Sequence, residues 1–90
     1  MIVEHEIIEQ IEEEPAGWTL SRVCRLISEL GRSDAMRVLE QMRAAGHIAL
    51  LDETGVRLAA WRSEQVWRDG RGWSGTRVAA TELGCAWVHG

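Results

Sequence analysis

A helix bracketed by two glycines is the feature that most constrains how this chain can fold. Ser33 can cap the first turn after Gly31, and Asp34 adds negative charge where the helix dipole favours it. Gly46 suits the left-handed residue that commonly ends a helix. The pattern therefore predicts a tight turn and then a helix over 33–45. Its apolar face consists of Ala35, Val38, Leu39 and Met42.

The residues after this helix have the pattern of a β-hairpin. We expect a strand over 47–51, followed by turn-forming residues at 52–55 that end in a glycine able to take a positive φ. Residues 56–58 then return as the second strand, so the hairpin is predicted over 47–60. The predicted order of elements is helix, turn, helix, hairpin.

Two more amphipathic helices are predicted before this segment. The first covers about 2–14 and ends near Pro15, and the second covers 19–30 with Thr19 as its N-cap. Three helices with facing apolar stripes can enclose a small core whose open side the hairpin covers, so we expect residues 1–60 to form the core of the domain. The stripes are Val3, Ile7, Ile8 and Ile11, then Leu20, Val23, Cys24, Ile27 and Leu30.

Residues 61–90 are predicted to form a tryptophan-rich C-terminal extension, for which two interpretations stay open. In the first, 61–68 and 73–80 are the arms of a second hairpin around the turn at 69–72, and Asp69-Gly70 slightly favours this. In the second, a short helix over 61–68 is followed by a loop and by a helix from Thr81. The segment after Thr81 can open a last short helix or a strand.

Charge is distributed unevenly along a chain whose net charge is −4. Residues 1–14 hold six glutamates and no arginine or lysine, whereas residues 15–80 hold all ten arginines against seven acidic residues, a net of +3. The chain after the first helix is therefore mildly basic, which is compatible with DNA binding. The glutamates most simply form a solvated face, and the functional alternative is a docking surface for a basic partner or for a second copy of the chain.

Composition argues against several classes of protein. Cys24 and Cys85 are too few and too isolated for a disulfide framework or a zinc site, so we expect reduced thiols in a cytoplasmic protein. No apolar run is long enough to cross a membrane, and the glutamates of 1–15 exclude a signal peptide. The three histidines fall on separate predicted elements, and no phosphate-binding loop follows a strand. We therefore expect no enzyme activity, no catalytic residue, no metal and no cofactor.

The stretch 33–48 resembles the recognition-helix region of winged-helix bacterial transcription regulators of the multidrug-resistance-regulator type. In that family a small polar residue opens the helix, an arginine lies near its middle, and a large apolar residue precedes a glycine by four before an apolar strand. Ser33, Arg37, Met42, Gly46 and Ile48 fill these places. The resemblance implies an α+β winged helix-turn-helix fold: a three-helix core, a β-hairpin wing and the tryptophan-rich C-terminal extension.

A second stretch, 78–84, is similar to the segment in which such proteins leave the wing and enter a C-terminal helix. If this similarity holds, the whole of 48–80 is an enlarged wing.

The resemblance implies sequence-specific binding of double-stranded DNA by a transcription regulator. Arg37 can reach a guanine edge, Gln41 can pair with adenine, and Ser33 with the helix start suits a phosphate oxygen. The arginines also have a plainer interpretation, because Arg37 with Asp34 and Arg43 with Glu40 can be i,i+3 surface pairs. The predicted DNA-binding residues are Arg22, Arg25, Arg32, Ser33, Met36, Arg37, Gln41 and Arg57.

A monomer of this size would make few phosphate contacts and would bind DNA weakly at physiological salt. We therefore expect a homodimer that reads two half-sites. Tryptophans at this density are either lids of the core or an interface. The candidate interface residues are Trp61, Trp67, Trp73 and Trp87.

The alternative is a winged-helix protein-interaction module, such as a phage-type inhibitor or an adaptor. The acidic first helix, the acidic hairpin tip at Asp52 and Glu53, and the tryptophan-rich tail favour it. An oligomerisation module without any ligand is a third interpretation.

Overall fold

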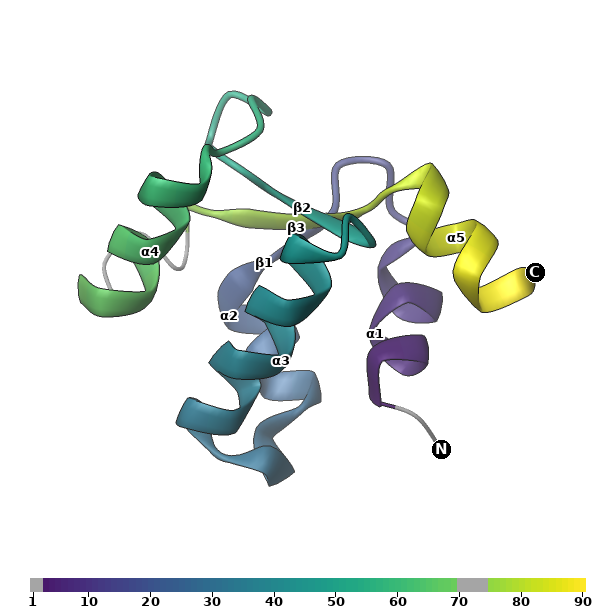
Figure 1. Cartoon of the computed structure of the whole chain (residues 1–90), viewed down its shortest axis with the longest axis horizontal. Helices are drawn as coiled ribbons and strands as arrows, with labels where there is room; N and C mark the ends of the chain where they lie inside the picture. The colour runs from purple at the N-terminus through teal and green to yellow at the C-terminus, as the bar shows by residue number, and fades with distance from the viewer. Residues whose placement is uncertain (1–2, 70–74) are drawn as a thin grey trace.

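Helices surround a small antiparallel sheet in this α+β structure (Figure 1). The computed structural model describes residues 3–69 and 75–90, except for the side chains of Trp61 and Asp69. This part of the chain contains five α-helices, one 3₁₀ turn and three strands. In chain order they are α1 (Val3–Ile11), β1 (Trp18–Thr19), α2 (Leu20–Leu26), η1 (Ser28–Leu30), α3 (Arg32–Ala44), β2 (Ile48–Leu51), α4 (Ala60–Asp69), β3 (Arg77–Ala80) and α5 (Glu82–His89).

The sheet has the order β1-β3-β2, and both pairings are antiparallel. Val78 of the central strand lies opposite Trp18 on one side and Leu50 on the other. In the view of Figure 1, α1, α2 and α3 lie below the sheet, with α4 at its left end and α5 at its right. This order of elements is compatible with a winged-helix layout.

The core forms where the predicted apolar stripes of α1, α2 and α3 meet the inner face of the sheet. All three isoleucines of α1 are fully buried, and the sheet contributes Ile48 and Leu50 of β2 and Val78 of β3 to the same cluster. Burial of this apolar surface is the main favourable term in the folding of the domain. The completely buried core side chains are Ile7, Ile8, Ile11, Leu20, Val23, Leu39 and Val78.

The ends of the helices follow local rules that the sequence displays. Thr19 accepts a hydrogen bond from the Arg22 backbone N–H at 3.3 Å and so caps α2, as predicted. Gly46, with a φ of 83°, ends α3 as predicted. The N–H of Gly46 donates to Arg43, and the N–H of His47 donates to Met42, each at 3.0 Å. These two bonds are those of a Schellman C-cap.

The first and second helices are shorter than predicted. α1 ends at Ile11, and a turn before Pro15 follows, because a residue that precedes proline avoids the helical region. α2 ends at Leu26, and a 3₁₀ turn completes the connection to α3.

The start of α3 corrects one prediction. Ser33 does not cap this helix, because the helix already begins at Arg32 with Gly31 in the cap position. The Ala35 N–H donates to the Gly31 carbonyl at 3.0 Å, which places Ser33 inside the first turn.

The predicted hairpin over 47–60 is only partly formed. Asp52 organises the turn, because its carboxylate accepts hydrogen bonds from the N–H of Thr54 at 2.8 Å and of Val56 at 2.9 Å. The returning segment, however, makes one isolated bridge, between Leu51 and Arg57. The strand that pairs along the whole of β2 is β3, because this pairing brings Val78 into the core.

The second predicted hairpin, with arms at 61–68 and 73–80, is wrong in its first arm. Residues 60–69 form α4 instead, which agrees with the alternative interpretation. Ser63, Val66 and Trp67 have the spacing of one helical face, and all three are at least half-buried. The predicted turn at 69–72 and the start of the second arm lie largely outside the described residues. β2 and β3 pair with one another, and α4 lies between them in the chain.

The last helix is attached to the end of α3. Thr81 accepts a hydrogen bond from the Gly84 N–H at 3.0 Å, and its hydroxyl donates to the Gly46 carbonyl at 2.5 Å. Gly84 lies against the backbone of His47, where an added Cβ would overlap the carbonyl oxygen and lie 2.9 Å from the carbonyl carbon. None of the helices among the described residues has the length and apolar content that a membrane-spanning helix requires.

The Gly84→Ala substitution tests this close approach. Helix propensity alone predicts that alanine stabilises the protein by about 1 kcal/mol, whereas the overlap with His47 predicts a loss of about 1–3 kcal/mol. We expect the loss, measured as the free energy of unfolding in urea. Ala86→Gly, at an exposed position of the same helix, is the control for propensity. A more stable Gly84→Ala protein would contradict the packing of α5 on His47.

Candidate nucleic-acid interface

α3 presents one exposed face to solvent. Ala35, Leu39 and Met42 are buried against the core, while residues on the opposite side of the helix are exposed. The exposed side chains include four polar residues, Ser33, Asp34, Arg37 and Gln41. Three of them, Ser33, Arg37 and Gln41, are spaced by four residues and follow one side of the helix, as predicted. Met36, also predicted to contact DNA, is half-buried.

Arg37 forms an ion pair with Asp34, three residues earlier on the same helix. Both side chains are more than half exposed. This is the i,i+3 surface pair that the sequence suggested as the plainer interpretation. Exposed pairs of this kind contribute at most about 1 kcal/mol, so another anion can replace Asp34 at little cost.

Two of the other predicted arginines lie on α2, and a third, Arg32, is the first residue of α3. Arg22 stacks its guanidinium over the Trp18 ring at 3.8 Å and pairs with Glu14 at 3.7 Å, so it is directed to the start of α2. Arg25 is exposed on α2. Arg32 lines a pocket of about 270 Å³ between α2 and α3, together with Cys24.

Arg57 is placed differently from the arginines of the helices. It lines a groove on the outer face of the sheet, beside Ala49 and Leu51. α3 packs on the inner face, where Ile48 and Leu50 point. The structure therefore groups Arg57 with the outer face of the sheet rather than with the exposed face of α3.

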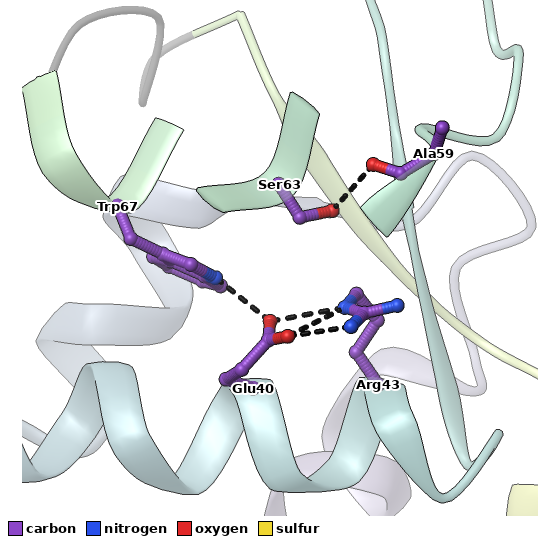
Figure 2. A network of polar contacts seen from close by, with 5 residues as sticks. All are labelled: Glu40, Arg43, Ala59, Ser63 and Trp67. Carbon is purple, nitrogen blue, oxygen red and sulfur yellow. Dashed lines mark hydrogen bonds and ion pairs between the residues drawn. The ribbon is translucent and has the colours of Figure 1, made fainter. Parts of the chain in front are cut away.

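One flank of α3 is covered by α4 through a polar network centred on Glu40 (Figure 2). The Arg43 guanidinium donates to both carboxylate oxygens of Glu40, with Nε at 2.9 Å from Oε2 and Nη2 at 2.5 Å from Oε1. The Trp67 indole N–H, which comes from α4, donates to Oε2 at 2.8 Å. Ser63 is buried in α4, and its hydroxyl donates to the Ala59 carbonyl at 3.3 Å.

The network has a clear electrostatic signature. The Arg43 guanidinium, and to a smaller extent the Trp67 indole, hold the pKa of the Glu40 carboxyl below its ordinary value, although partial burial opposes this. The same bonds to Glu40 raise the pKa of Arg43. Arg43 is thus occupied within the protein, and Arg37 and Gln41 are the predicted reading residues that stay exposed on this helix.

The tryptophans predicted as an interface have separate roles. Trp67 is half-buried against α3 and acts as a lid of the core. Trp87 is 40% exposed and lies between two rings, stacked on His47 at 4.4 Å and edge-on to His5 at 4.3 Å. Trp73 and the side chain of Trp61 lie outside the described residues.

Sequence reasoning missed several structural partners. Trp18 was not predicted to lie in the core or in a strand, although its apolar size is a signal of burial. Arg77 donates to the Gly17 carbonyl at 3.0 Å, and His89 pairs with Glu12 at 2.9 Å, which joins α5 to α1. Both contacts join residues far apart in sequence, so no local pattern reveals them.

Among the described residues, no group of His, Cys, Asp and Glu side chains is arranged to hold a metal ion. The sequence matches no protein-family model, and the comparisons with curated proteins and with solved structures also find no match.

The Glu40→Gln substitution tests the network that joins α3 to α4. Because the folded-state pKa of Glu40 is lowered, its ionised form stabilises the protein above the unfolded-state pKa, and this stabilisation is lost as the pH falls through the folded-state pKa. We expect Glu40→Gln to be less stable than the parent by about 1 kcal/mol at neutral pH. The difference, measured by urea unfolding, should shrink on acidification.

The matched control is Asp52→Asn. The pKa of Asp52 is also lowered, through hydrogen bonds from Thr54 and Val56, but this carboxylate lies in the exposed hairpin turn. In the double variant, the losses in the free energy of unfolding should add, because the two carboxylates have no shared hydrogen-bond partner. A Glu40→Gln difference that stays constant across the pH range would contradict the assignment.

Proposed function

We propose that this chain is a winged helix-turn-helix domain that binds double-stranded DNA in a sequence-specific manner and acts as a transcription regulator. The observation that carries the proposal is the exposed face of α3, which begins after Gly31 and ends before Gly46. A helix supported on one side by a core and open on the other can enter the major groove of DNA.

The chemistry of this face suits base recognition. Arg37 is exposed, and its partner Asp34 holds it only by a surface pair. On approach to DNA, the guanidinium can exchange this carboxylate for the O6 and N7 acceptors of guanine. Gln41 lies one turn further along the helix, where its amide can pair with adenine.

Phosphate contacts are available at the beginning of α3. No side chain caps this end of the helix, so its first N–H groups can donate to a phosphate oxygen, together with the exposed hydroxyl of Ser33. Arg25 on the preceding helix and Arg32 at the start of α3 are exposed, where they can neutralise the flanking phosphates. One copy of the chain makes only this small set of contacts and therefore binds DNA weakly, which favours a homodimer on two half-sites.

A protein-interaction module is the second candidate function. It is favoured by the acidic surface at the end of α1, where Glu9 of the helix and Glu13 of the turn that follows are exposed. Glu12, which belonged to the predicted acidic face, is paired with His89 and is mostly covered. In this alternative, α1 would bind a basic surface of another protein.

Arg37→Ala is the direct test of DNA reading. In an oligonucleotide selection followed by salt titration, we expect log K to fall with log[salt] at roughly −0.9 per phosphate neutralised. We expect Arg37→Ala to lose about 1–3 kcal/mol of discrimination at one base position, because the bidentate contact to guanine is gone. Its circular dichroism should match that of the parent protein.

Arg43→Ala is the matched control on the same helix. It removes the other i,i+3 arginine, whose guanidinium is occupied by Glu40 under α4, so base preference should be unchanged. Equal effects of the two substitutions on base preference would contradict the proposed reading face. Absence of binding to any duplex at low salt would overturn the DNA proposal.

A pair of charge reversals tests the protein-interaction alternative. Glu9→Lys with Glu13→Lys changes exposed positions of α1 and of the turn after it, so the free energy of unfolding should change by less than about 0.5 kcal/mol. If α1 docks a basic partner, the double variant should lose capture of that partner in a pull-down from cell extract. Capture that stays unchanged would leave the acidic face a solvated surface.

A further inference from the structure

A shallow groove lies on the outer face of the sheet, on the side away from the core. It has a volume of about 550 Å³, and its floor includes Ala49 and Leu51 of β2 and Ala79 of β3. Leu83 of α5 forms one side and Arg57 of the hairpin forms another. Figure 1 shows how the hairpin loop and α5 stand at opposite ends of the sheet.

Leu83, one of the large apolar side chains that are exposed in the described residues, lines this groove. Leu83 is 57% exposed and Trp87 is 40% exposed, and their i,i+4 spacing places both on one face of α5. Val56 is 61% exposed and neighbours Arg57 in the hairpin. Clustered apolar surface with a polar rim is typical of a protein interaction site.

The charges of the rim are complementary to each other. Arg57 lines the groove at the hairpin, and Glu82 lines it at the start of α5. Both are exposed, and neither forms an ion pair with another described residue. A surface with one positive and one negative end is self-complementary under a two-fold rotation.

We propose that this groove is the surface by which a second copy of the chain docks. In a two-fold dimer, Arg57 meets Glu82 of the partner subunit, and the same pair forms again on the other side of the axis. Leu83 of each copy then covers the small residues at the floor of the other groove. The closely packed centre would be apolar and the rim charged, as in stable interfaces.

The dimer surface leaves the exposed face of α3 open. The groove is on the outer face of the sheet, whereas α3 packs on the inner face, so one copy does not need to release DNA to bind another. The inference deepens the homodimer part of the proposed function. Its test uses protein without DNA, so that its failure and the failure of DNA binding are distinguishable.

Sedimentation equilibrium of the full chain, with the Leu83→Glu variant, is the first test. We expect a dimer of the 10.1 kDa chain at about 100 µM, a concentration at which a micromolar Kd gives mostly dimer. Leu83→Glu should raise the dissociation constant about a hundredfold, because it places a charge in the apolar centre of both sides. Leu83 is exposed in one copy, so circular dichroism should stay unchanged.

A charge exchange identifies the orientation of the two copies. Arg57→Glu and Glu82→Arg should each raise the dissociation constant about tenfold, because each places like charges opposite one another. The double variant should restore most of the parent affinity. Arg68→Glu, an exposed reversal on α4, is the control and should leave the dimer intact.

The outcomes separate the possible occupants of the groove. A chain that is monomeric at about 100 µM would overturn the proposal and leave the groove to a different partner. If the Leu83→Glu variant remained a dimer, the copies would associate through another surface and the proposal would be overturned. The same conclusion would follow if the double variant of Arg57 and Glu82 did not restore the affinity of the parent. A dimer that behaves as expected but binds no DNA would retain this inference and remove the proposed function.

Discussion

The pairing of β3 with both β1 and β2 is the constraint on which the rest of the structure depends. It brings Val78 into the centre of the core and ties the sheet to the turn before β1, where Arg77 donates to the carbonyl of Gly17, 60 residues away in sequence. The same pairing closes the segment between β2 and β3, so that α4 is held beside α3. It also directs the chain into α5, whose cap attaches to the end of α3.

The contact of α4 with α3 gives two similar ion pairs different surroundings. Two ion pairs on α3 have the same i,i+3 spacing, Arg37 with Asp34 and Arg43 with Glu40. The sequence predicts both as exposed surface pairs. The first remains in solvent, where its energy is small and its partner is replaceable. The second lies under Trp67, where Glu40 also accepts the indole N–H and where solvent screens the partly buried ion pair less. The exposed face of α3 is therefore narrower than the helix alone suggests.

Much of the helical core was predictable because its signals are local. The apolar stripes, the Thr19 cap and the left-handed Gly46 all depend on residues a few positions apart, and the structure confirms them. The Ser33 cap failed because Gly31 takes the cap position two residues earlier than predicted. The second hairpin failed in its first arm because Asp69-Gly70 favoured a turn between two strands, while Ser63, Val66 and Trp67 carried the weaker pattern of a helix. The candidate site was predictable only in part, since covered and exposed arginines look alike in sequence.

The sequence by itself determined the apolar faces of the first three helices, the Thr19 cap and the end of α3 at Gly46, because capping and helical periodicity act within one or two turns. Tertiary structure alone decided that β3, rather than the nearby residues 56–58, pairs along β2, and that α4 covers Glu40. Only the competition for burial in one shared core distinguishes a distant strand from a near one. That competition is a property of the folded chain as a whole.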